Sequence, residues 1–557
     1  MTAADPHRFP RRAVLALLAL AATLGLLELG RRDLWAPDEP KYALVAREML
    51  ETGQFLRPHV NGAPYPDKPP LLFWCIALAS LVTGGVGQPA AVLPSILAML
   101  LTLWATGRLA HRLSGQRAPP VLAVGLLLVA YRFISQGTFG QIDMLLTACT
   151  TWAFLLLVEG GGLLEGRPVD RRRIVGAFAL MGLGILAKGP VALICPLGGF
   201  LLGAALAGRR DTWRSLRSAA AWLTLLAVVG AWLIPAAVGA LSGGQQAWLE
   251  NILFRQTAVR YAASWHHHQP PWYFLVVPWY DFLPTILLLP AAAWSLLRGE
   301  DRHRTAPRLL AGACLFVLIF FSIPSGKRGL YLMPLYPWLA TWLAIDLDRR
   351  LQRAGRALAP LRGAGMLLGV AFLAAAAWLP AGLEKVRQRQ GVDLPAAPLF
   401  TVLLLLTLAH LWLALRPGRR ALAGTFATWL LLHGLIFTVI HPAFDPRKSA
   451  RPFIAAIRQR TVEEATGGMV DFRAQFAFYG GRLLTAQPRD DAAMDRIARR
   501  LESDEPFWVI VRRPQAEGLL SRIHPDRRPT LIVEKGVGDK DLVVYANRAA
   551  LKDADRP

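Results

Sequence analysis

The sequence predicts a polytopic α-helical membrane protein that ends in a small α/β domain. Its 557 residues are 54% hydrophobic and their mean hydropathy is positive, a composition outside the soluble globular norm. Apolar runs of roughly 17 to 23 residues, each able to cross a hydrocarbon core of about 30 Å, recur until residue 440. After His441, charged periodic segments alternate with short β-type runs.

The basic residues carry a topology signal. A formal net charge of +24 would suit a nucleic-acid partner only if Lys and Arg gathered on one folded surface. They fall instead in short patches between the apolar runs, as they do in the cytoplasmic loops of membrane proteins. We therefore expect no nucleic-acid partner.

The first two apolar runs decide the topology. Residues 13–29 follow basic residues but lack an A-x-A cleavage pattern, so we expect a retained helix rather than a signal peptide. Residues 71–83 are short for a span. If they lie in the membrane interface, every later arginine-rich loop falls on the cytoplasmic side, as the positive-inside rule requires. Those loops are residues 108–118, 159–173, 208–217, 298–308, 348–363 and 416–420.

This arrangement predicts about thirteen spans, with the N-terminus cytoplasmic and the C-terminus on the outer, periplasmic-type face. The expected spans are residues 13–29, 91–107, 119–135, 141–158, 174–188, 190–207, 217–239, 273–297, 307–323, 329–347, 364–383, 398–415 and 421–440. Two domains follow from it. Residues 1–441 form a transmembrane domain that includes a first periplasmic loop at 30–70 and an interfacial helix at 71–83, and residues 442–557 form a periplasmic α/β domain.

The first periplasmic loop opens the candidate site. Asp38, followed by Pro40, is typical of a helix start. The helix that follows is amphipathic, with Tyr42, Val45 and Met49 on its apolar face, so we expect it to lie on the membrane. Asp38 has two interpretations, a helix cap or a chemical group, and the local sequence does not choose between them.

Further ionisable side chains occur on the same predicted face. Lys68 opens the interfacial segment, where a lysine more often only reaches toward lipid headgroups. Asp143 stands at the outer end of a span, where an ionisable residue is functional by default. The later outer loops add Arg255, Arg260, His266, His267, His268, Lys327, Arg328 and Tyr331. Carboxylates and cations at one membrane surface suit a lipid phosphate as substrate.

A polyprenyl-phosphate sugar matches this set chemically. Its apolar tail fits between spans, and Lys and Arg can neutralise the phosphate that leaves when the anomeric carbon is attacked. A carboxylate beside the anomeric carbon can accept the proton of a hydroxyl nucleophile. The expected reaction is a single displacement with inversion.

The C-terminal region is expected to form helices at 450–461 and 490–502 and strands at 507–511, 530–533 and 542–545. It contains no nucleophile elbow, P-loop or dinucleotide-binding turn. We expect it to cover or shape the active site, and a purely structural cap fits equally well.

Several short motifs resemble one known family in order along the chain. They are DEPKYALVAREML (38–50), VNGAPYPDKPPLLFW (60–74), GQIDMLL (140–146), GLGILAKGPVAL (182–193), FRQTAVRY (254–261) and SGKRGLYLMPLYP (325–337). They resemble the lipid A aminoarabinose transferases, relatives of the protein O-mannosyltransferases among the C-type (GT-C) membrane glycosyltransferases. The resemblance implies the same fold, undecaprenyl phosphate as the carrier of the donor sugar, lipid A as acceptor, and a place in a bacterial inner membrane with the active site on the periplasmic face.

The resemblance also implies roles for individual residues. Asp38 would be the catalytic acid/base carboxylate, with Asp143 in the same cavity. The lipid phosphate and sugar would be bound by Lys41, Tyr42, Lys68, Arg255, Lys327 and Tyr331, with Glu39 and His266 as further candidates. Lys41 stands where this family usually has Arg, which preserves a point charge but not a bidentate contact.

No cofactor is predicted with a defined ligand set. Asp67 stands where a Glu is common in this family, and a divalent metal held by Asp67 and His266 is left open, since no third acid has a clear spacing to them. With an ionised lipid A phosphate as acceptor no base is needed, because its second pKa is about 6. Asp38 would then orient the amino sugar or the donor.

The predicted function is transfer of a sugar, 4-amino-4-deoxy-L-arabinose or another amino sugar, from undecaprenyl phosphate to a lipid A phosphate. One alternative is a hexosyl- or mannosyltransferase that uses a polyprenyl phosphate donor and acts on protein or another envelope glycan. An alternative of another class, a flippase for lipid-linked sugars, would need charged groups deep in several spans. Here the ionisable groups gather at the outer ends.

Overall fold

The computed structural model describes residues 8–164, 168–253, 268–481, 484–488 and 490–553. They divide into two compact units. The helical unit comprises Met1–Leu29, Tyr65–Cys75 and Val92–Val439, and the mixed unit comprises Gly30–Pro64, Ile76–Ala91 and Ile440–Pro557. Helices α3 (Leu71–Thr83) and α4 (Gln88–Ser114) are each divided between the two units.

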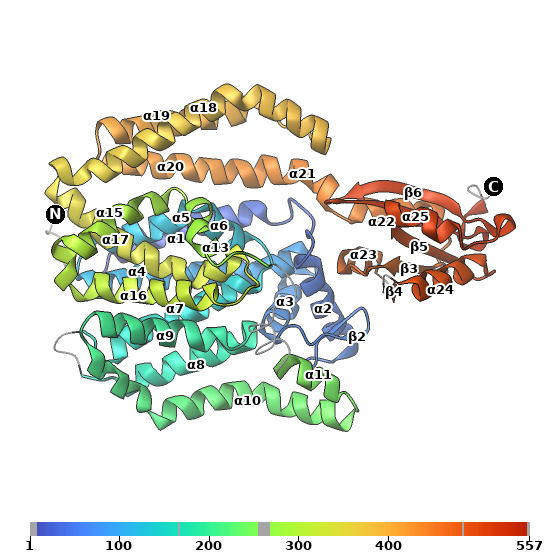
Figure 1. Cartoon of the computed structure of the whole chain (residues 1–557), viewed down its shortest axis with the longest axis horizontal. Helices are drawn as coiled ribbons and strands as arrows, with labels where there is room; N and C mark the ends of the chain where they lie inside the picture. Colours follow the sequence, from blue (N-terminus) through green and yellow to red (C-terminus); the bar gives the residue numbers. More distant parts are fainter. Residues whose placement is uncertain (1–7, 165–167, 254–267, 482–483, 489, 554–557) are drawn as a thin grey trace. The chain divides into compact units, whose positions relative to one another are not determined.

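The helical unit is a bundle of apolar helices joined by short turns (Figure 1). Its longer helices are α1 (Arg11–Glu28), α5 (Ala118–Leu128), α6 (Tyr131–Thr138), α7 (Ile142–Gly160), α8 (Arg171–Lys188), α9 (Val191–Leu206), α10 (Ala219–Ser242), α15 (Leu289–Arg298), α16 (Thr305–Ser322), α17 (Tyr336–Arg353), α18 (Ala359–Gln390), α19 (Ala396–Leu415) and α20 (Arg419–Leu435). Its short helical turns are η1 (Arg210–Arg217), α11 (Gln246–Glu250), α13 (Tyr273–Val276), α14 (Pro278–Asp281), η3 (Thr285–Leu288), η4 (Glu300–His303), η5 (Gly329–Leu335), η6 (Gly355–Leu358) and the π-turn η7 (Ile436–Ile440).

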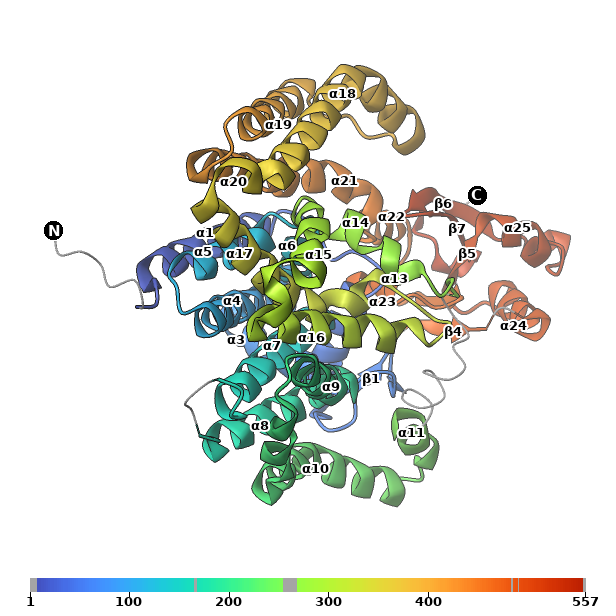
Figure 2. The same ribbon diagram turned by 60° about the vertical axis from the view of Figure 1, so that its left-hand side comes forward.

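Within this unit, sequence neighbours pack side by side. Helices α7, α8 and α9 lie together, and so do α18 and α19, in both views (Figures 1 and 2). Glycines allow close contact between α9 and α16, since a Cβ added to Gly312 would meet the Cα of Gly203 at 2.6 Å. Small residues at helix crossings are typical of membrane bundles.

Seven helices within the described ranges are long and apolar enough to cross a membrane, or up to nine if each of two bent pairs is one span. One bent pair is α5 with α6, at 72°, and the other joins residues 273–281 to 285–298 at 113°. The predicted runs 119–135 and 273–297 are therefore not straight helices. The total of about thirteen spans remains a prediction.

Two predicted elements compare closely with the structure. The interfacial segment 71–83 forms α3 over those residues. Helix α18 runs from Ala359 to Gln390, past the predicted end at 383, because the polar residues that follow the apolar run are good helix formers and Gln388 hydrogen-bonds to Glu384 one turn back.

The mixed unit contains a five-stranded sheet of order β4-β3-β5-β7-β6. Strands β3 and β4 and strands β3 and β5 are parallel, whereas β5 with β7 and β6 with β7 are antiparallel. Its elements are α2 (Glu39–Thr52), β1 (His59–Val60), β2 (Ala63–Pro64), α21 (His441–Lys448), α22 (Arg451–Arg460), β3 (Thr466–Val470), α23 (Ala474–Gly480), β4 (Thr485–Gln487), α24 (Asp491–Glu502), β5 (Phe507–Arg512), α25 (Arg513–Leu520), η8 (Pro525–Arg527), β6 (Thr530–Val537), β7 (Lys540–Ala546) and η9 (Arg548–Ala550).

An apolar core lies between this sheet and helices α24 and α25. Its largest members include Phe507, Leu519 and Tyr545, with Ile497 from α24. The β-type runs predicted at 507–511, 530–533 and 542–545 lie inside β5, β6 and β7. The same unit holds segment 30–64, so the first predicted loop and the C-terminal region are parts of one compact body.

Candidate active site

Asp38 lies at the start of α2 in the mixed unit and is half-buried. It occupies the N-cap position, yet its carboxylate makes no capping hydrogen bond to the described backbone of the helix. A cap residue normally contributes through that bond. The role of Asp38 as a chemical group of the site stays a prediction. Lys41 is half-buried and Tyr42 is buried, one turn further along the same helix.

The residue beside Asp38 is locked by a buried ion pair. Both Glu39 oxygens accept from the Arg32 guanidinium, at 2.6 and 2.9 Å, and the Trp35 amide donates to Glu39 Oε2 at 2.9 Å. The side chains of Arg32 and Glu39 are 0% and 1% exposed. A bidentate pair of this kind fixes orientation. Glu39 thus holds the start of α2 in place, which explains its carboxylate without a substrate.

The chain before Asp38 is held by residues near the beginning of the C-terminal region. Asp445 Oδ1 accepts from the Asp33 amide at 2.9 Å and from the Trp35 indole at 2.7 Å. The Asp33 carboxylate in turn accepts from the Ser449 hydroxyl and pairs with Arg451 at 2.7 Å. Burial raises the pKa of Asp445, and the nearby Asp33 carboxylate raises it further. Segment 30–64 is therefore shaped by contacts with residues more than 400 positions away.

Two more contacts bind the same segment to α23 and its neighbours. The Leu34 amide donates to the Tyr479 hydroxyl at 2.7 Å, and burial raises the pKa of Tyr479. Arg47 donates to the Phe478 carbonyl at 2.8 Å and its guanidinium lies 4.0 Å from the centroid of the Phe478 ring. Burial lowers the pKa of Arg47.

The polar face of α2 is also covered. Glu48 is 5% exposed and accepts from the amides of Asn61 and Gly62, at 2.5 and 3.0 Å. Asn61 then exchanges two hydrogen bonds with the Leu484 backbone, at 2.8 and 2.9 Å. Tyr42, Val45 and Met49 on the predicted apolar face are all under 5% exposed, so protein atoms cover this face, whereas the sequence predicted that it lies on the membrane. The helix is amphipathic in sequence but covered on both sides, so Glu48 faces the hairpin β1–β2 rather than water.

The helical unit holds a second set of charged residues. Asp143, in the first turn of α7, is 6% exposed and accepts a hydrogen bond from Lys188, the last residue of α8. These positions suit the helix dipoles, which favour acids at N-termini and bases at C-termini. Lys188 also lies 5.0 Å from the centroid of the Tyr331 ring. The cluster therefore combines a carboxylate, an ammonium group and a phenol.

The segment that follows Lys68 packs on an apolar cluster that includes a residue near the end of α8. Leu71 and Trp74 contact a cluster that contains Leu186, two residues before Lys188, together with Trp248 and Ile252. Lys68 itself is half-buried. The start of α3, a residue near the end of α8 and the chain that precedes residue 254 thus share one apolar cluster. Three separate motifs of the sequence thus meet at one end of the helical unit.

Lys327 occupies a related but distinct position. It is 3% exposed and donates to the Gln269 carbonyl at 3.2 Å. The Gln269 amide donates to the Ser325 carbonyl at 3.0 Å, and His268 forms a β-bridge with Gly326. Burial lowers the pKa of Lys327. This lysine therefore ties the 324–328 turn to the chain at 268–269.

Two predicted site residues lie outside the described residues, namely Arg255 and His266. Asp67 is half-buried. No group of three or more His, Cys, Asp or Glu side chains with a metal-binding arrangement occurs within the described ranges. The metal at Asp67 and His266 stays an open alternative, because one of its two ligands is not described.

Among the ion pairs of the helical unit that sequence reasoning missed, two involve residues within or at the end of apolar runs. Lys188 lies inside a motif that the resemblance uses, but no role was assigned to it. Arg132 pairs with Asp281 at 2.7 Å, and Asp281 is 5% exposed. Each residue interrupts or ends an apolar run, which is the signal that could have found it.

Comparison with known proteins identifies similar chains. A family model described as dolichyl-phosphate-mannose-protein mannosyltransferase matches residues 67–238. The undecaprenyl phosphate-alpha-4-amino-4-deoxy-L-arabinose arabinosyl transferase of Pseudomonas aeruginosa strain LESB58 is 32% identical over 446 residues, which are 76% of this chain and 75% of that protein.

Solved structures share the fold. ArnT from Cupriavidus metallidurans, in its crystal structure bound to undecaprenyl phosphate, superposes with a TM-score of 0.79 at 20% identity, over 96% of this chain and 98% of that one. The archaeal oligosaccharyltransferase AglB from Archaeoglobus fulgidus superposes with a TM-score of 0.52 at 11% identity, over 98% and 75%. The membrane glycosyltransferase fold that the resemblance implies is confirmed.

Proposed function

Because this chain belongs to the family of undecaprenyl phosphate-aminoarabinose arabinosyl transferases, we propose that it moves an amino sugar from undecaprenyl phosphate to a phosphate of lipid A. The observation that carries the proposal is the 32% identity with the Pseudomonas aeruginosa transferase over 75% of its length. The Cupriavidus metallidurans structure supports the choice of carrier, since it is described as bound to undecaprenyl phosphate.

The proposed reaction is a single displacement. An oxygen of the acceptor phosphate attacks the anomeric carbon of the sugar, and the bond from that carbon to the donor phosphate oxygen breaks. Undecaprenyl phosphate leaves with the bonding electron pair, so the site must stabilise negative charge on the departing phosphate. No proton transfer is required, because the acceptor phosphate is already ionised near neutral pH.

We assign the site residues on this basis. Lys68, Arg255 and Tyr331 hold the donor phosphate with help from Tyr42, while Lys41 and Lys327 add positive charge nearby. Asp38 orients the amino sugar or the donor, and with a hydroxyl acceptor it would instead act as general base. Support comes from the contact of Lys188 with the Tyr331 ring and from the apolar cluster that Leu71 and Trp74 share with Leu186.

The proposed topology places this chemistry on the periplasmic face, with the N-terminus cytoplasmic and the C-terminal region periplasmic. It rests on the arginine-rich loops, which the positive-inside rule places on the cytoplasmic side. A cysteine-accessibility assay with a membrane-impermeant reagent tests it. A cysteine introduced at Gln487 should react in intact spheroplasts, and one introduced at Arg210 should react only after lysis.

The test of function is mass spectrometry of lipid A from cells with the protein intact, deleted, or carrying Asp38→Ala. A pentosamine or hexosamine mass on a lipid A phosphate that is lost in both altered strains supports the proposal. Identical lipid A in all three strains overturns the acceptor. An unchanged product in the Asp38→Ala strain alone overturns the role of Asp38.

A second candidate function has one specific observation in its favour. The mannosyltransferase family model covers residues 67–238, and proteins of that description use a polyprenyl-type phosphate donor and a protein acceptor. A hexosyl transfer to protein would need a base for the hydroxyl nucleophile, so Asp38→Asn should abolish it at every pH. Glycoproteomics of the envelope in the deletion strain separates this function from lipid A modification, and a flippase would show transport without covalent transfer.

A further inference from the structure

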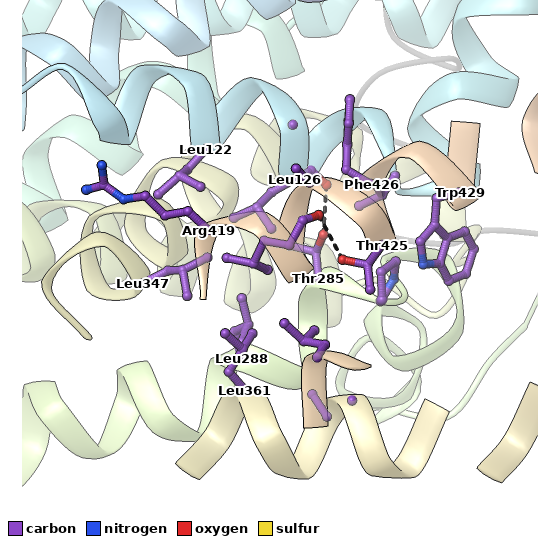
Figure 3. Close-up of a pocket in the computed structure, with 18 of the residues that line it drawn as sticks. Leu122, Leu126, Thr285, Leu288, Leu347, Leu361, Arg419, Thr425, Phe426 and Trp429 are labelled. Carbon is purple, nitrogen blue, oxygen red and sulfur yellow. Dashed lines mark hydrogen bonds between the residues drawn. The ribbon is translucent and has the colours of Figure 1, made fainter. Parts of the chain in front are cut away.

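The helical unit contains an apolar cavity whose lining includes neither Lys327 nor any member of the cluster of Asp143, Lys188 and Tyr331. It has a volume of about 450 Å³, within the range of small-molecule sites. Helices α1, α5, α17, α18, α19 and α20 surround it together with η3. Figure 3 shows Arg419 at one end of the cavity and Trp429 at the other.

One stripe of α20 forms a wall along the length of the cavity. Arg419, Leu422, Phe426 and Trp429 all line it, and their spacing of three, four and three residues places them on one helix face. The stripe is about 15 Å long, given a rise of about 1.5 Å per residue. The cavity is therefore an elongated slot that suits an extended hydrocarbon chain.

The polar groups of three residues that line the cavity are already satisfied within the protein. The Thr285 hydroxyl donates to the Leu126 carbonyl at 2.7 Å, and the Thr425 hydroxyl donates to the Leu422 carbonyl at 2.8 Å. The Trp429 indole donates to His410 at 3.3 Å. These three residues therefore offer no unsatisfied hydrogen-bond donor to a ligand, and the cavity wall around them is apolar.

The opposite end carries positive charge. The Arg419 side chain is 69% exposed, and its ion-pair partner Asp348 is 3.6 Å away. Arg416 and Arg420 are exposed on either side of it. This end combines an accessible guanidinium with the mouth of an apolar slot. A membrane phospholipid with an anionic headgroup has the complementary form.

We propose that this cavity binds one acyl chain of an anionic phospholipid, whose phosphate contacts Arg419 at the mouth. The site lies apart from the residues assigned to the transfer reaction and would make the protein's stability sensitive to the lipid composition of the membrane. The occupant is a bilayer lipid and not the donor, because the mouth lies near the C-terminal end of α17, whereas the Tyr331 cluster lies before its N-terminal end. Asp348 stands twelve residues, or roughly 18 Å, beyond Tyr336, where α17 begins just after the Tyr331 cluster.

Photo-crosslinking tests the occupant. The full-length protein is reconstituted in nanodiscs of phosphatidylethanolamine and phosphatidylglycerol that contain a phosphatidylglycerol with a diazirine in its acyl chain. After irradiation, peptides of α5 and α20 that carry Leu122 and Ala423 should be labelled. A diazirine-bearing undecaprenyl phosphate is used in a parallel sample. Labelling of these peptides by the polyprenyl probe alone, or by neither probe, overturns the proposal.

A filling substitution tests the cavity itself. A Cβ at Gly125 would lie 3.8 Å from the Phe426 ring, an ordinary contact, so Gly125→Phe projects a ring into the slot without a backbone clash. Labelling of the two peptides should fall to the level found without irradiation. Labelling that persists in Gly125→Phe overturns the proposal.

The charge at the mouth is tested separately, so that a folding defect of Gly125→Phe does not decide the outcome. Arg419→Gln should lower the ratio of phosphatidylglycerol to phosphatidylethanolamine that copurifies with the protein about fivefold. Arg214→Gln is the matched control, because Arg214 is 71% exposed and lies 3.8 Å from its partner Asp211. An equal change in both variants, or none in Arg419→Gln, overturns the contact with the phosphate.

Discussion

Two buried ion pairs, one in each unit, are built differently. The Arg32–Glu39 pair is bidentate, and the two side chains are 0% and 1% exposed. The Lys188–Asp143 pair has a single ion contact, its side chains are 15% and 8% exposed, and Lys188 also faces the Tyr331 ring. In the first pair, both carboxylate oxygens of Glu39 are bound by Arg32. The Lys188 ammonium group has three donors, so it can bind a ligand in addition to Asp143.

This difference separates a structural brace from a ligand-responsive group. Glu39 adjoins the proposed catalytic Asp38, and its pairing with Arg32 fixes the start of α2 whether or not substrate is present. Lys188 sits at the end of a helix, beside a phenol and near the start of α3. A phosphate that approaches this cluster can replace the Asp143 carboxylate as the partner of the Lys188 ammonium group. Removing each pair should therefore have different consequences for stability and for activity.

The largest effect is expected for Glu39→Gln. The substitution leaves the Arg32 guanidinium buried without a carboxylate, which should lower the free energy of unfolding by about 3 to 5 kcal/mol. Denaturant titration of the detergent-solubilised full chain, followed by intrinsic fluorescence, measures it. Glu534→Gln is the control, because its pair with Arg513 is exposed, at 44% and 67%, and should contribute at most about 1 kcal/mol. Equal losses in both variants would contradict the brace.

Lys188→Met should reduce sugar transfer about tenfold or more, since a charge-assisted hydrogen bond to a phosphate is lost. The double variant Lys188→Met with Asp143→Asn removes both charges and should recover stability lost in the single variant, while transfer stays low. The two measurements are the thermal midpoint and the transfer rate with purified undecaprenyl phosphate donor. Recovery of both in the double variant would show that the pair is only structural.

A smaller effect is expected at the hairpin β1–β2, which joins segment 30–64 to the C-terminal region. Asn61→Ala removes two hydrogen bonds to the Leu484 backbone and should lower the free energy of unfolding by about 1 to 2 kcal/mol. Asn61→Asp keeps the acceptor for the Leu484 amide and should lose less. The ranking of the two variants in denaturant titration is the check, and a reversed ranking would contradict the assigned contacts.

The smallest effect concerns the pH dependence of stability through Asp445. Its folded pKa is raised by burial, so its protonation favours the folded state. That stabilisation is complete below the ordinary carboxyl pKa of about 3.9 and is lost as the pH rises through the raised folded value. Asp445→Asn keeps an oxygen acceptor for the Trp35 indole, and its side-chain amide does not titrate.

The stability of Asp445→Asn relative to the natural protein should therefore increase as the pH rises from acid toward neutral. Thermal midpoints of both proteins across that range measure the difference. A difference that is constant with pH would contradict the raised pKa. Asp33, which the Asp445 carboxylate faces, and Arg451, which pairs with Asp33, remain unchanged in both proteins.

Much of the fold follows from local composition. The helix at 71–83, the apolar helices and the late strands lie close to where apolar periodicity places them, because each of these signals is contained within a few neighbouring residues. The bends between α5 and α6 and within residues 273–298 were missed. A continuous apolar run does not state where the backbone turns, since the run is equally apolar on both sides of the bend.

The candidate site divides in the same way. Asp38, Lys68, Asp143 and Tyr331 were predicted from their places at the ends of apolar runs and from the family motifs, and their roles stay predictions. Glu39 was predicted to be a further substrate-binding candidate, yet the structure engages both of its oxygens with Arg32. The sequence could not identify its partner, because it places several arginines near Glu39 and does not show which of them contacts the carboxylate.

By itself, the sequence determined which segments are apolar, which charges stand at their ends and which family the motifs resemble. Only the tertiary structure decided which charges pair with each other, such as Lys188 with Asp143 at a separation of 45 residues and Arg132 with Asp281 at 149. The physical reason is the cost of burying a charge, which is repaid only by a partner at contact distance. That distance is a property of the folded chain and not of the order of its residues.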